Sequence, residues 1–518
     1  MSRKLVRFFL IIAAPLVAQV SVLTYQYDTT RAGVNSRERI LTPANVNSKR
    51  FGKLFAVGVD GYIYGQPLYL PDVSIAGGTH NVVFVATEHD SVYAFDADSP
   101  QLLWQVSFLD PANGVTSVPT SDVNCEVQIS PEIGITSTPV IDAASNTIYV
   151  VAMTKENGSY FHRLHALDVA TGAERPGSPV TIQASSPGTG DGGIVDTLIP
   201  KNYKQRTGLL LLNGVVYFGM ASHCDNNTYH GWFLGYDAGS LRQVAMFNAT
   251  PNGAMGSFWM GGAAPAVDSE GNIYLVSANG TFDAAAGGAD FGESYLKLSA
   301  NRGLALADYF TPFNVGALDE EDEDTGSSGV VLLPDEAGSP ARPHLLVGAG
   351  KEGRVYLLDR DHLGQWQQGS DSQIPQSIPS AVRSAYGNAA YFNGTVYFCG
   401  ANDFLRAFPV ANATLGIPTI STFTYPFPGC VPTISANGVS NGVLWTIDAS
   451  PALRAYNPAD VTTELYDSNQ NAARDALEGS VKFTVPAVVN GKVYVPTPWA
   501  LVVYGLLPPK RPGKRGTA

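Results

Sequence analysis

Short segments with apolar residues at alternate positions recur along the whole chain, in pairs joined by a polar, glycine-containing turn. The clearest pair runs from Leu345 to Arg360, where Leu-Leu-Val-Gly-Ala-Gly and Val-Tyr-Leu-Leu-Asp flank the turn Lys-Glu-Gly-Arg. Apolar positions with a period of two on both sides of a turn predict a β-hairpin rather than a helix. Similar hairpins are predicted at 82–98, 147–168, 215–237, 272–299, 395–407, 443–456 and 492–504.

The regular spacing of these hairpins predicts an all-β, eight-bladed β-propeller over residues 51–507, because self-similarity at a period of roughly 45 to 70 residues is typical of repeat architectures. The last repeat ends at Pro508 without an outer strand, whereas Phe51–Val59 is an alternating strand that precedes the first repeat. We expect this N-terminal strand to pair with the hairpin at 492–504 and close the ring, which removes an exposed sheet edge. Residues 471–477 predict a single helical turn.

The two ends of the chain differ from the repeats. Residues 1–20 carry Arg3, Lys4 and Arg7 before the apolar run 8–17 and small residues near Ala18, a pattern typical of a signal peptide. The run is too short for a stable membrane span. Residues 21–50 predict an irregular N-terminal arm, and residues 508–518 a disordered basic tail. We therefore expect a secreted or periplasmic monomer.

Composition narrows the partners and the redox compartment. The 53 Gly and 34 Pro with only 15% charged residues fit many short strands joined by turns, and a net charge of −13 argues against nucleic acid as a partner. The four cysteines permit disulfides in an exported chain but leave the connectivity open. We favour Cys399–Cys430, which would tie adjacent blades, and Cys125–Cys224, which would pin two loops on one face.

Charged residues stand at the same turn position of four hairpins, and we expect them to face one end of the ring together. These turns are Glu88-His89-Asp90, Lys155-Glu156, His223-Cys224-Asp225 and Lys351-Glu352. Solvated turns without a site are the alternative. None of His162, His165, His223 and His230 has the spacing of a metal motif, so no histidine site is predicted.

Several connections are long enough to suggest function or disorder: 107–134, 183–206, 222–231, 278–292 and 314–328. The last contains the acidic run 319–324, which by itself indicates either a solvated loop or a cation site.

Two repeats resemble the A-x-D-x-x-T-G-x-x-x-W unit of the pyrroloquinoline quinone (PQQ) type propellers. They are Ala94–Asp98 with Trp104, and Ala166–Gly172. In that family the Trp docks on the next blade, and the Asp and Thr-Gly shape the turn that places it. The resemblance covers roughly residues 50–506 and implies the same fold.

Three segments are similar to active-site segments of the PQQ-dependent alcohol dehydrogenases. Asn279 ends a strand like the one whose Asn binds Ca²⁺ or a lanthanide, and Asp324 lies where those enzymes carry their catalytic base. Lys351 resembles the residue that contacts the quinone carbonyls. Asp225 falls at the position of the metal-binding Glu. The resemblance implies an oxidoreductase for an alcohol or sugar, with PQQ and a hard cation held by Asn279, Asp324 and Asp225.

The resemblance is incomplete around the cofactor. The family's adjacent cysteine pair is absent, and Trp259 precedes Gly261-Gly262 where the family has a Trp after its Gly-Gly. The further candidates for the channel mouth are Glu88, His89, Glu156, His223, Trp259 and Glu352. The ligand is expected to be a small molecule or a glycan. Two alternatives stay open: a non-catalytic scaffold that binds a protein or glycan, and a lyase or hydrolase that uses the acid and His residues at the mouth.

Overall fold

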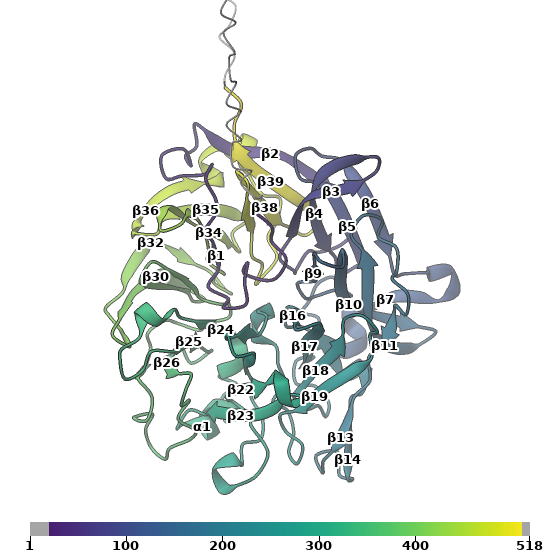
Figure 1. The fold of residues 1–518 in the computed structure, drawn as a ribbon, viewed down its shortest axis with the longest axis vertical. Coiled ribbons are helices and arrows are strands. Elements are labelled where there is room, and N and C mark those ends of the chain that lie inside the picture. The colour runs from purple at the N-terminus through teal and green to yellow at the C-terminus, as the bar shows by residue number, and fades with distance from the viewer. Residues whose placement is uncertain (1–19, 510–518) are drawn as a thin grey trace, which may run out of the picture.

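Eight antiparallel blades surround a central channel in the computed structural model, which describes residues 20–509 (Figure 1). This arrangement confirms the predicted eight-bladed β-propeller. The predicted signal peptide, apart from residue 20, and the predicted tail, apart from Pro508 and Pro509, lie outside the described residues.

In most blades the first strand lies nearest the channel and later strands follow outward (Figure 1). Blade 1 contains β3 (Leu68–Ile75), β4 (Gly78–Ala86), β5 (Ser91–Asp96) and β6 (Leu102–Ser107). Blade 2 contains β7 (Val115–Pro119), β8 (Glu132–Ile133), β9 (Val140–Asp142), β10 (Thr147–Glu156), β11 (Ser159–Asp168) and β12 (Val180–Thr181). Blade 3 contains β15 (Tyr203–Gln205), β16 (Leu210–Leu212), β17 (Val215–Ser222), β18 (Trp232–Asp237) and β19 (Gln243–Asn248). Blade 4 contains β20 (Ala266–Val267), β21 (Asn272–Val276), β22 (Tyr295–Ser299) and β23 (Ala305–Phe310).

The second half of the ring repeats the pattern. Blade 5 contains β24 (Val330–Leu332), β25 (Leu345–Ala349), β26 (Val355–Asp359) and β27 (Gln376–Ile378). Blade 6 contains β28 (Ala390–Phe392), β29 (Thr395–Cys399), β30 (Asp403–Ala411), β31 (Thr414–Leu415) and β32 (Thr419–Tyr425). Blade 7 contains β33 (Thr433–Asn437), β34 (Ser440–Asp448), β35 (Ala452–Asn457) and β36 (Asp460–Asp467). Blade 8 contains β37 (Ala487–Val489), β38 (Lys492–Pro496) and β39 (Ala500–Leu506).

Helices are short and lie between blades. The helix α1 (Val315–Glu320) belongs to the connection that carries the acidic run, and α2 (Ala472–Asp475) confirms the single helical turn predicted at 471–477. Across residues 20–509, no helix combines the length and the apolar character needed to cross a membrane.

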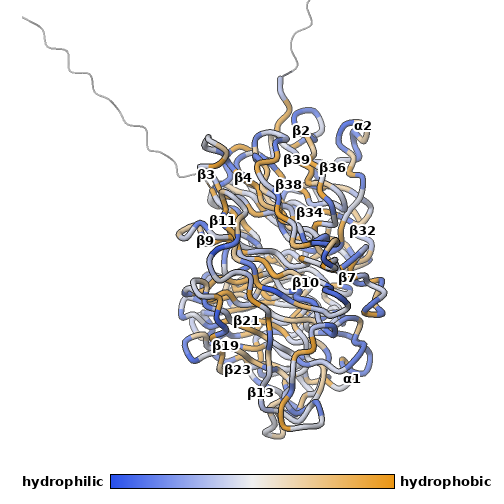
Figure 2. Tube along the Cα trace, turned by 90° about the vertical axis from the view of Figure 1, so that its right-hand side faces the viewer, coloured by the Kyte–Doolittle hydropathy of each residue, from blue (hydrophilic) through white to orange (hydrophobic). Residues whose placement is uncertain are grey.

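An N-terminal strand closes the ring, as the sequence predicts. The strand β2 (Phe51–Gly58) pairs antiparallel with β39, from Phe51 opposite Leu506 to Gly58 opposite Ala500, and completes blade 8. Phe51 is fully buried, with its ring centroid 5.4 Å from that of Trp445 and 4.9 Å from that of Tyr466. The closing strand therefore supplies both sheet hydrogen bonds and core packing. In the side view, apolar segments run along the strands, and many connections at the edge of the molecule are hydrophilic (Figure 2).

The first blade docks on the second through Trp104. Its indole nitrogen donates to the carbonyl of Val169 at 3.0 Å. Gly172 has a φ of +71°, and a Cβ at this position would lie only 2.8 Å from the indole ring. Asp168 accepts from the backbone and hydroxyl of Thr171, which fixes the turn. The Trp and the Asp and Thr-Gly turn thus have the roles that the resemblance implies.

The N-terminal arm crosses the middle of the ring (Figure 1) and hydrogen-bonds to the inner strands of most blades. It contains one short strand, β1 (Val34–Asn35), which pairs parallel with β33. Backbone N–H groups of inner strands donate to arm carbonyls: Tyr69 to Val22, Ile141 to Leu23, Val267 to Thr29, Leu332 to Thr30, Tyr391 to Ala32 and Ile434 to Gly33. Because these inner edges face the channel, the arm satisfies backbone groups that would otherwise lack partners.

Two disulfides occur within residues 20–509, and both have the pairing that the sequence favours. Cys399–Cys430 ties the end of β29 to the connection before β33, so it joins adjacent blades. Cys125–Cys224 joins the connection after β7 to the connection after β17.

Candidate functional site

A cavity of about 450 Å³ lies at the end of the channel where the inner strands begin. Its wall combines the connections that lead into β9, β20, β24, β28, β33 and β37 with residues at the ends of β17, β21 and β25. Segments from most of the ring therefore meet here. Tyr25 of the arm lies close to Arg206 on this wall, so the arm also supports the site.

Asp324, Lys351 and Asn279 come together on one side of this cavity. The Lys351 Nζ atom lies 2.7 Å from Asp324 Oδ2 and 2.8 Å from Asp322 Oδ1. The other Asp324 oxygen accepts from the backbone N–H of Asn279 at 3.0 Å. Asn279 and Asp324 are almost completely buried, whereas Asp322 is exposed.

Close backbone packing places the Asp324 carboxylate. The Lys351 N–H donates to the Asp324 carbonyl at 2.9 Å. Gly350 permits this approach, because a Cβ at this position would lie 2.6 Å from the same carbonyl oxygen. On the other side, the N–H of Thr325 donates to Glu293, a buried acid that the sequence analysis missed. Backbone hydrogen bonds of Asp324 itself and of the next residue, Thr325, thus fix the position of the carboxylate.

Burial sets the protonation of these groups. It raises the pKa of Asp324 above the usual range of an aspartate, although Lys351 opposes the change. Burial and the nearby charge of Asp324 raise the pKa of Glu293 as well. Burial alone would lower the pKa of Lys351, but Asp324 and Asp322 raise it above its ordinary value. Asp324 is therefore a stronger base than an exposed aspartate and is paired with a firmly protonated lysine.

Asp225 adds a further carboxylate to the cavity wall. Its Oδ1 atom accepts from the Ser222 hydroxyl at 2.7 Å and from the Tyr229 hydroxyl. With Asp324 and Asn279 it gives the cavity carboxylate and amide oxygens, which are the ligands that hard cations prefer. All three residues proposed from the sequence as metal ligands line the same cavity.

A basic wall, made of Lys204, Arg206 and Lys482, also lines the cavity. Lys204 is buried and donates to the carbonyl of Ser222 and to the side chain of Gln128. Burial and the adjacent Arg206 lower the pKa of Lys204 to about 7 and that of Lys482 to about 8. Neither Lys204 nor Arg206 forms an ion pair with a carboxylate in the described part of the chain. The wall is suited to binding an anionic ligand.

Aromatic side chains form a second group on the cavity wall: Trp259, Tyr386, Phe427 and Phe483. The ring centroid of Trp259 lies 6.2 Å from those of Tyr386 and Phe483. Lys351 Nζ lies 5.8 Å from the Trp259 centroid. Trp259, one of the channel-mouth candidates from the sequence, therefore lines the cavity although it precedes Gly261-Gly262. The short turn at Met260–Gly262 reverses the chain after Trp259 and leaves the indole on the cavity wall.

Four of the predicted channel-mouth residues do not line the cavity. Glu88 is fully buried, accepts from the N–H of Gly134 at 2.8 Å and has its pKa raised to about 8 by burial. His223 is buried, with Nε2 2.8 Å from the carbonyl of Tyr203. His89 pairs with Glu132, and Glu156 with Arg163. The connection through Gly134 covers Glu88, whereas His89 and Glu156 are partly exposed in ion pairs away from the cavity. A turn position alone does not reveal these differences.

Glu352 also points away from the cavity. It pairs with Arg354 at 3.1 Å and accepts from Asn314, in a neighbouring depression that Lys351 shares. The side chains of these two consecutive residues therefore have different surroundings: Lys351 lines the cavity and Glu352 does not.

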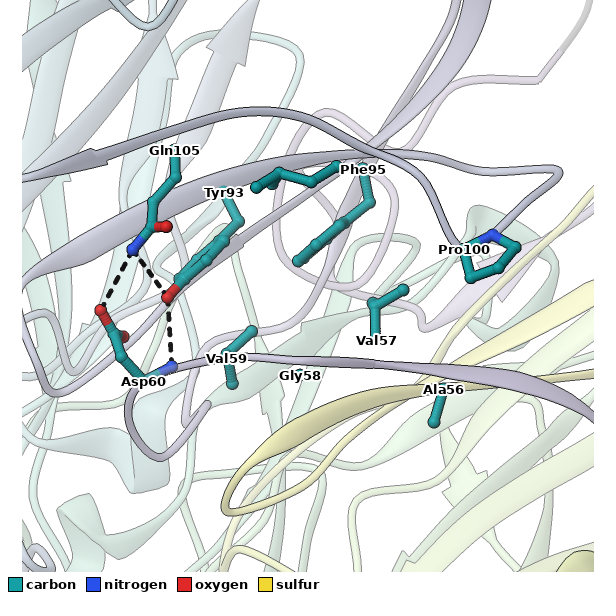
Figure 3. A pocket seen from close by; sticks show the side chains of 10 residues that line it. Ala56, Val57, Gly58, Val59, Asp60, Tyr93, Phe95, Pro100 and Gln105 are labelled. Carbon is teal, nitrogen blue, oxygen red and sulfur yellow. Dashed lines mark hydrogen bonds between the residues drawn. The ribbon is translucent and has the colours of Figure 1, made fainter.

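Another depression lies between the closing strand β2 and blade 1 (Figure 3). Here Gln105 donates to the Tyr93 hydroxyl at 2.9 Å and to Asp60 at 3.4 Å, and the Asp60 N–H donates to Tyr93 at 3.1 Å. These groups satisfy one another, and the other lining residues are mostly apolar. We therefore place the candidate site at the channel mouth.

Comparisons with known proteins agree with this architecture. The chain matches no protein-family model and, by sequence, no curated protein. Its structure is similar to that of the quinohemoprotein alcohol dehydrogenase from Comamonas testosteroni, with a TM-score of 0.63, 14% identity and coverage of 94% of this chain and 80% of the other. For the quinohemoprotein alcohol dehydrogenase ADHIIG from Pseudomonas putida HK5, the TM-score is 0.63 at 16% identity, and the match covers 95% of this chain and 82% of the other. For a europium-containing methanol dehydrogenase, the TM-score is 0.62 at 12% identity, and the match covers 94% of this chain and 98% of the other. The chain therefore shares the propeller fold of these proteins at low sequence identity.

Proposed function

We propose that the protein is a PQQ-dependent oxidoreductase that oxidises an alcohol or sugar at the channel mouth. The observation that carries the proposal is the convergence of Asp324, Asn279 and Lys351 with Trp259 in one cavity of about 450 Å³. This volume suits a small planar cofactor together with a small substrate. Each of the first three residues matches a functional position of the family that the sequence resembles.

The residues of the cavity fit the chemistry of this cofactor. PQQ is a planar ortho-quinone with three carboxylates. Lys204, Arg206 and Lys482 offer charge-assisted hydrogen bonds to carboxylates. The indole of Trp259 offers an aromatic surface for a flat ring system. Asp324, Asn279 and Asp225 would hold the Ca²⁺ or lanthanide ion through oxygen atoms.

The chain's own groups would prepare the substrate. When bound, PQQ with its cation supplies a hydride acceptor and a Lewis acid. Asp324 takes the hydroxyl proton of the alcohol, since burial raises its pKa and makes it a stronger base. Lys351 keeps this carboxylate ionised and oriented from 2.7 Å away. The aromatic side chains of Trp259 and Tyr386 limit the access of water to the pair.

We infer further that the protein works in an oxidising compartment outside the cytoplasm. Two disulfides join residues of the described chain, and such bonds persist in secreted and periplasmic proteins. The basic segment and apolar run at the start of the sequence support export.

Reconstitution tests the activity. Purified protein is incubated with PQQ and either Ca²⁺ or Eu³⁺, and reduction of an artificial electron-accepting dye is followed with primary alcohols and aldoses. We expect turnover that requires both PQQ and the cation, because each supplies a different part of the chemistry. Stoichiometric PQQ binding without dye reduction by any substrate in the panel would leave a binding protein and overturn the proposed oxidoreductase.

The basic wall predicts a pH-dependent affinity for carboxylates. Burial lowers the pKa of Lys204 to about 7 and that of Lys482 to about 8, so both are protonated at pH 6 and neutral at pH 9. We expect the Kd of benzene-1,3,5-tricarboxylate, measured by calorimetry without metal, to rise about tenfold between these pH values, since charged hydrogen bonds are lost. In Lys204→Met the change should be smaller. Equal affinities of the wild type at both pH values would contradict the proposed role.

A further inference from the structure

The connection 183–206 carries a small hairpin that the propeller itself does not need. It consists of β13 (Ser185–Pro187) and β14 (Val195–Thr197), and it projects from the edge of the ring beside blade 3 (Figure 1). The N–H groups of Thr189 and Gly190 donate to the carbonyl of Pro251 at 2.8 and 3.1 Å. The tip of the hairpin is therefore attached to the segment that follows β19.

Asp191 and Asp196 of this hairpin meet His230, which precedes β18. In the described chain, this is the group of three metal-ligating side chains whose ligand atoms all lie within 4.8 Å of one another. His230 Nε2 is 3.1 Å from Asp191 Oδ1 and 4.0 Å from Asp196 Oδ1. The side chains of His230 and Asp196 are 1% and 0% exposed, and that of Asp191 is 26% exposed. The group is thus buried on one side and open to solvent on the other.

The other face of the imidazole is fixed by the backbone. His230 Nδ1 lies 3.0 Å from the carbonyl oxygen of Thr250, which can only accept, so Nδ1 carries a proton. In the neutral ring, Nε2 then turns its lone pair toward the two carboxylates. This is the orientation of metal-binding histidines, whose second nitrogen donates to a carbonyl or carboxylate.

No lysine or arginine within residues 20–509 forms an ion pair with Asp191 or Asp196. Asp196 accepts from the backbone N–H of Asp191 at 3.0 Å and from Asn248 at 3.2 Å, which orients its carboxylate next to the ring. Gly190 lets the hairpin approach, because a Cβ there would lie 2.4 Å from Cε1 of His230. Two carboxylates and a ring lone pair thus converge without a protein cation.

We propose that Asp191, Asp196 and His230 bind a divalent cation of the zinc type, which fastens the β13–β14 hairpin to blade 3. One imidazole and two carboxylates are a ligand set that Zn²⁺ accepts, and the exposed side near Asp191 leaves a coordination position for water. Ca²⁺ prefers oxygen ligands alone and is expected to bind weakly here. None of the three residues lines the cavity at the channel mouth, so the site is independent of the proposed function.

Calorimetry with Zn²⁺ tests this site on chelator-treated full-length protein. We expect the wild type to bind one equivalent of Zn²⁺ at this site. Asp191→Asn should bind Zn²⁺ at least about tenfold more weakly, because one of the direct metal ligands is removed. Asp191 is partly exposed, so this variant is expected to fold. Asp361→Asn is the matched control, since Asp361 is another carboxylate in contact with a histidine, the exposed His344 at 2.8 Å, and lies outside the proposed site.

A second variant and a second readout keep the test decisive. Asp324→Asn should leave the Zn²⁺ affinity unchanged, which separates this site from the channel mouth. Zn²⁺ should also slow proteolysis of the hairpin near the exposed Ile194 in the wild type but not in Asp191→Asn. Equal Zn²⁺ binding by the wild type and Asp191→Asn, or no binding by either, would overturn the proposal. The contact would then be a hydrogen bond between His230 and Asp191 without a metal.

Discussion

Replacing Asp324 by Asn is expected to lower the turnover number of the PQQ- and cation-loaded protein by about 1000-fold, the range of a lost general base. The amide keeps the size of the carboxylate but cannot take the hydroxyl proton. Since Asp324 is buried and its pKa is raised, the neutral substitute should not destabilise the fold. The initial rate of dye reduction at saturating PQQ and cation is the measurement, with the melting temperature as a check on folding.

The neighbouring Asp322 provides the control. It contacts the same Lys351 amine at 2.8 Å, but its side chain is 63% exposed. Asp322→Asn should therefore change the turnover number less than about tenfold, because exposed ion pairs contribute little. Equal losses in the two variants would mean that Lys351 neutralisation, and not a base at Asp324, matters for the reaction.

Deleting the arm, residues 20–38, is expected to lower the free energy of unfolding by at least about 5 kcal/mol. The deletion leaves inner-strand N–H groups such as those of Ile141, Val267 and Leu332 without partners. The melting temperature should fall by about 5 °C or more, because the entropy of unfolding is large in a domain of this size. Truncation after Pro509 is the control, because it removes none of the described residues. Equal melting temperatures of the two truncations would contradict the role of the arm.

A point variant covers the case in which the shortened chain does not fold. Arg31 is fully buried in the arm, and its guanidinium donates to the carbonyls of Pro265 and Tyr25 at 2.9 and 2.7 Å. Arg31→Met should cost about 3 kcal/mol, since it leaves buried acceptors unpaired. The exposed Arg39→Met is the matched control and should be neutral. An unchanged melting temperature for Arg31→Met would show that the arm adds little.

The fold could be predicted from the sequence because the hairpin signal is local and repeated. Alternating apolar residues and a glycine turn, as at Leu345–Arg360, are sufficient to recognise one blade, and repetition then gives the ring. The unpaired strand at Phe51–Val59 likewise indicates how the ring closes. The position of the N-terminal arm across the ring could not be predicted. Its carbonyls accept hydrogen bonds from strands up to 400 residues away in the sequence, and no side-chain pattern encodes these contacts.

The candidate site could be predicted only in part. Asn279, Asp324 and Lys351 stand at motif positions of neighbouring blades, so ring geometry brings them together. Lys204 lies in blade 3, and Lys482 lies just before blade 8. In the sequence each resembles an ordinary surface lysine. One signal for Lys204 was present: it lies in a short inner strand between buried residues. The turn position of Glu88 predicted a place at the channel mouth, but the connection through Gly134 covers this turn.

The central claim is that the channel mouth binds PQQ together with a hard cation. The most direct test is an equilibrium titration of the protein with PQQ in the presence of Ca²⁺ or Eu³⁺, followed by quenching of tryptophan fluorescence. We expect one saturable site that needs the cation, with affinity lowered at least about tenfold in Arg206→Met, whose wild-type guanidinium lies in the basic wall. Absence of saturable binding, or the same affinity in Arg206→Met as in the wild type, would contradict the account.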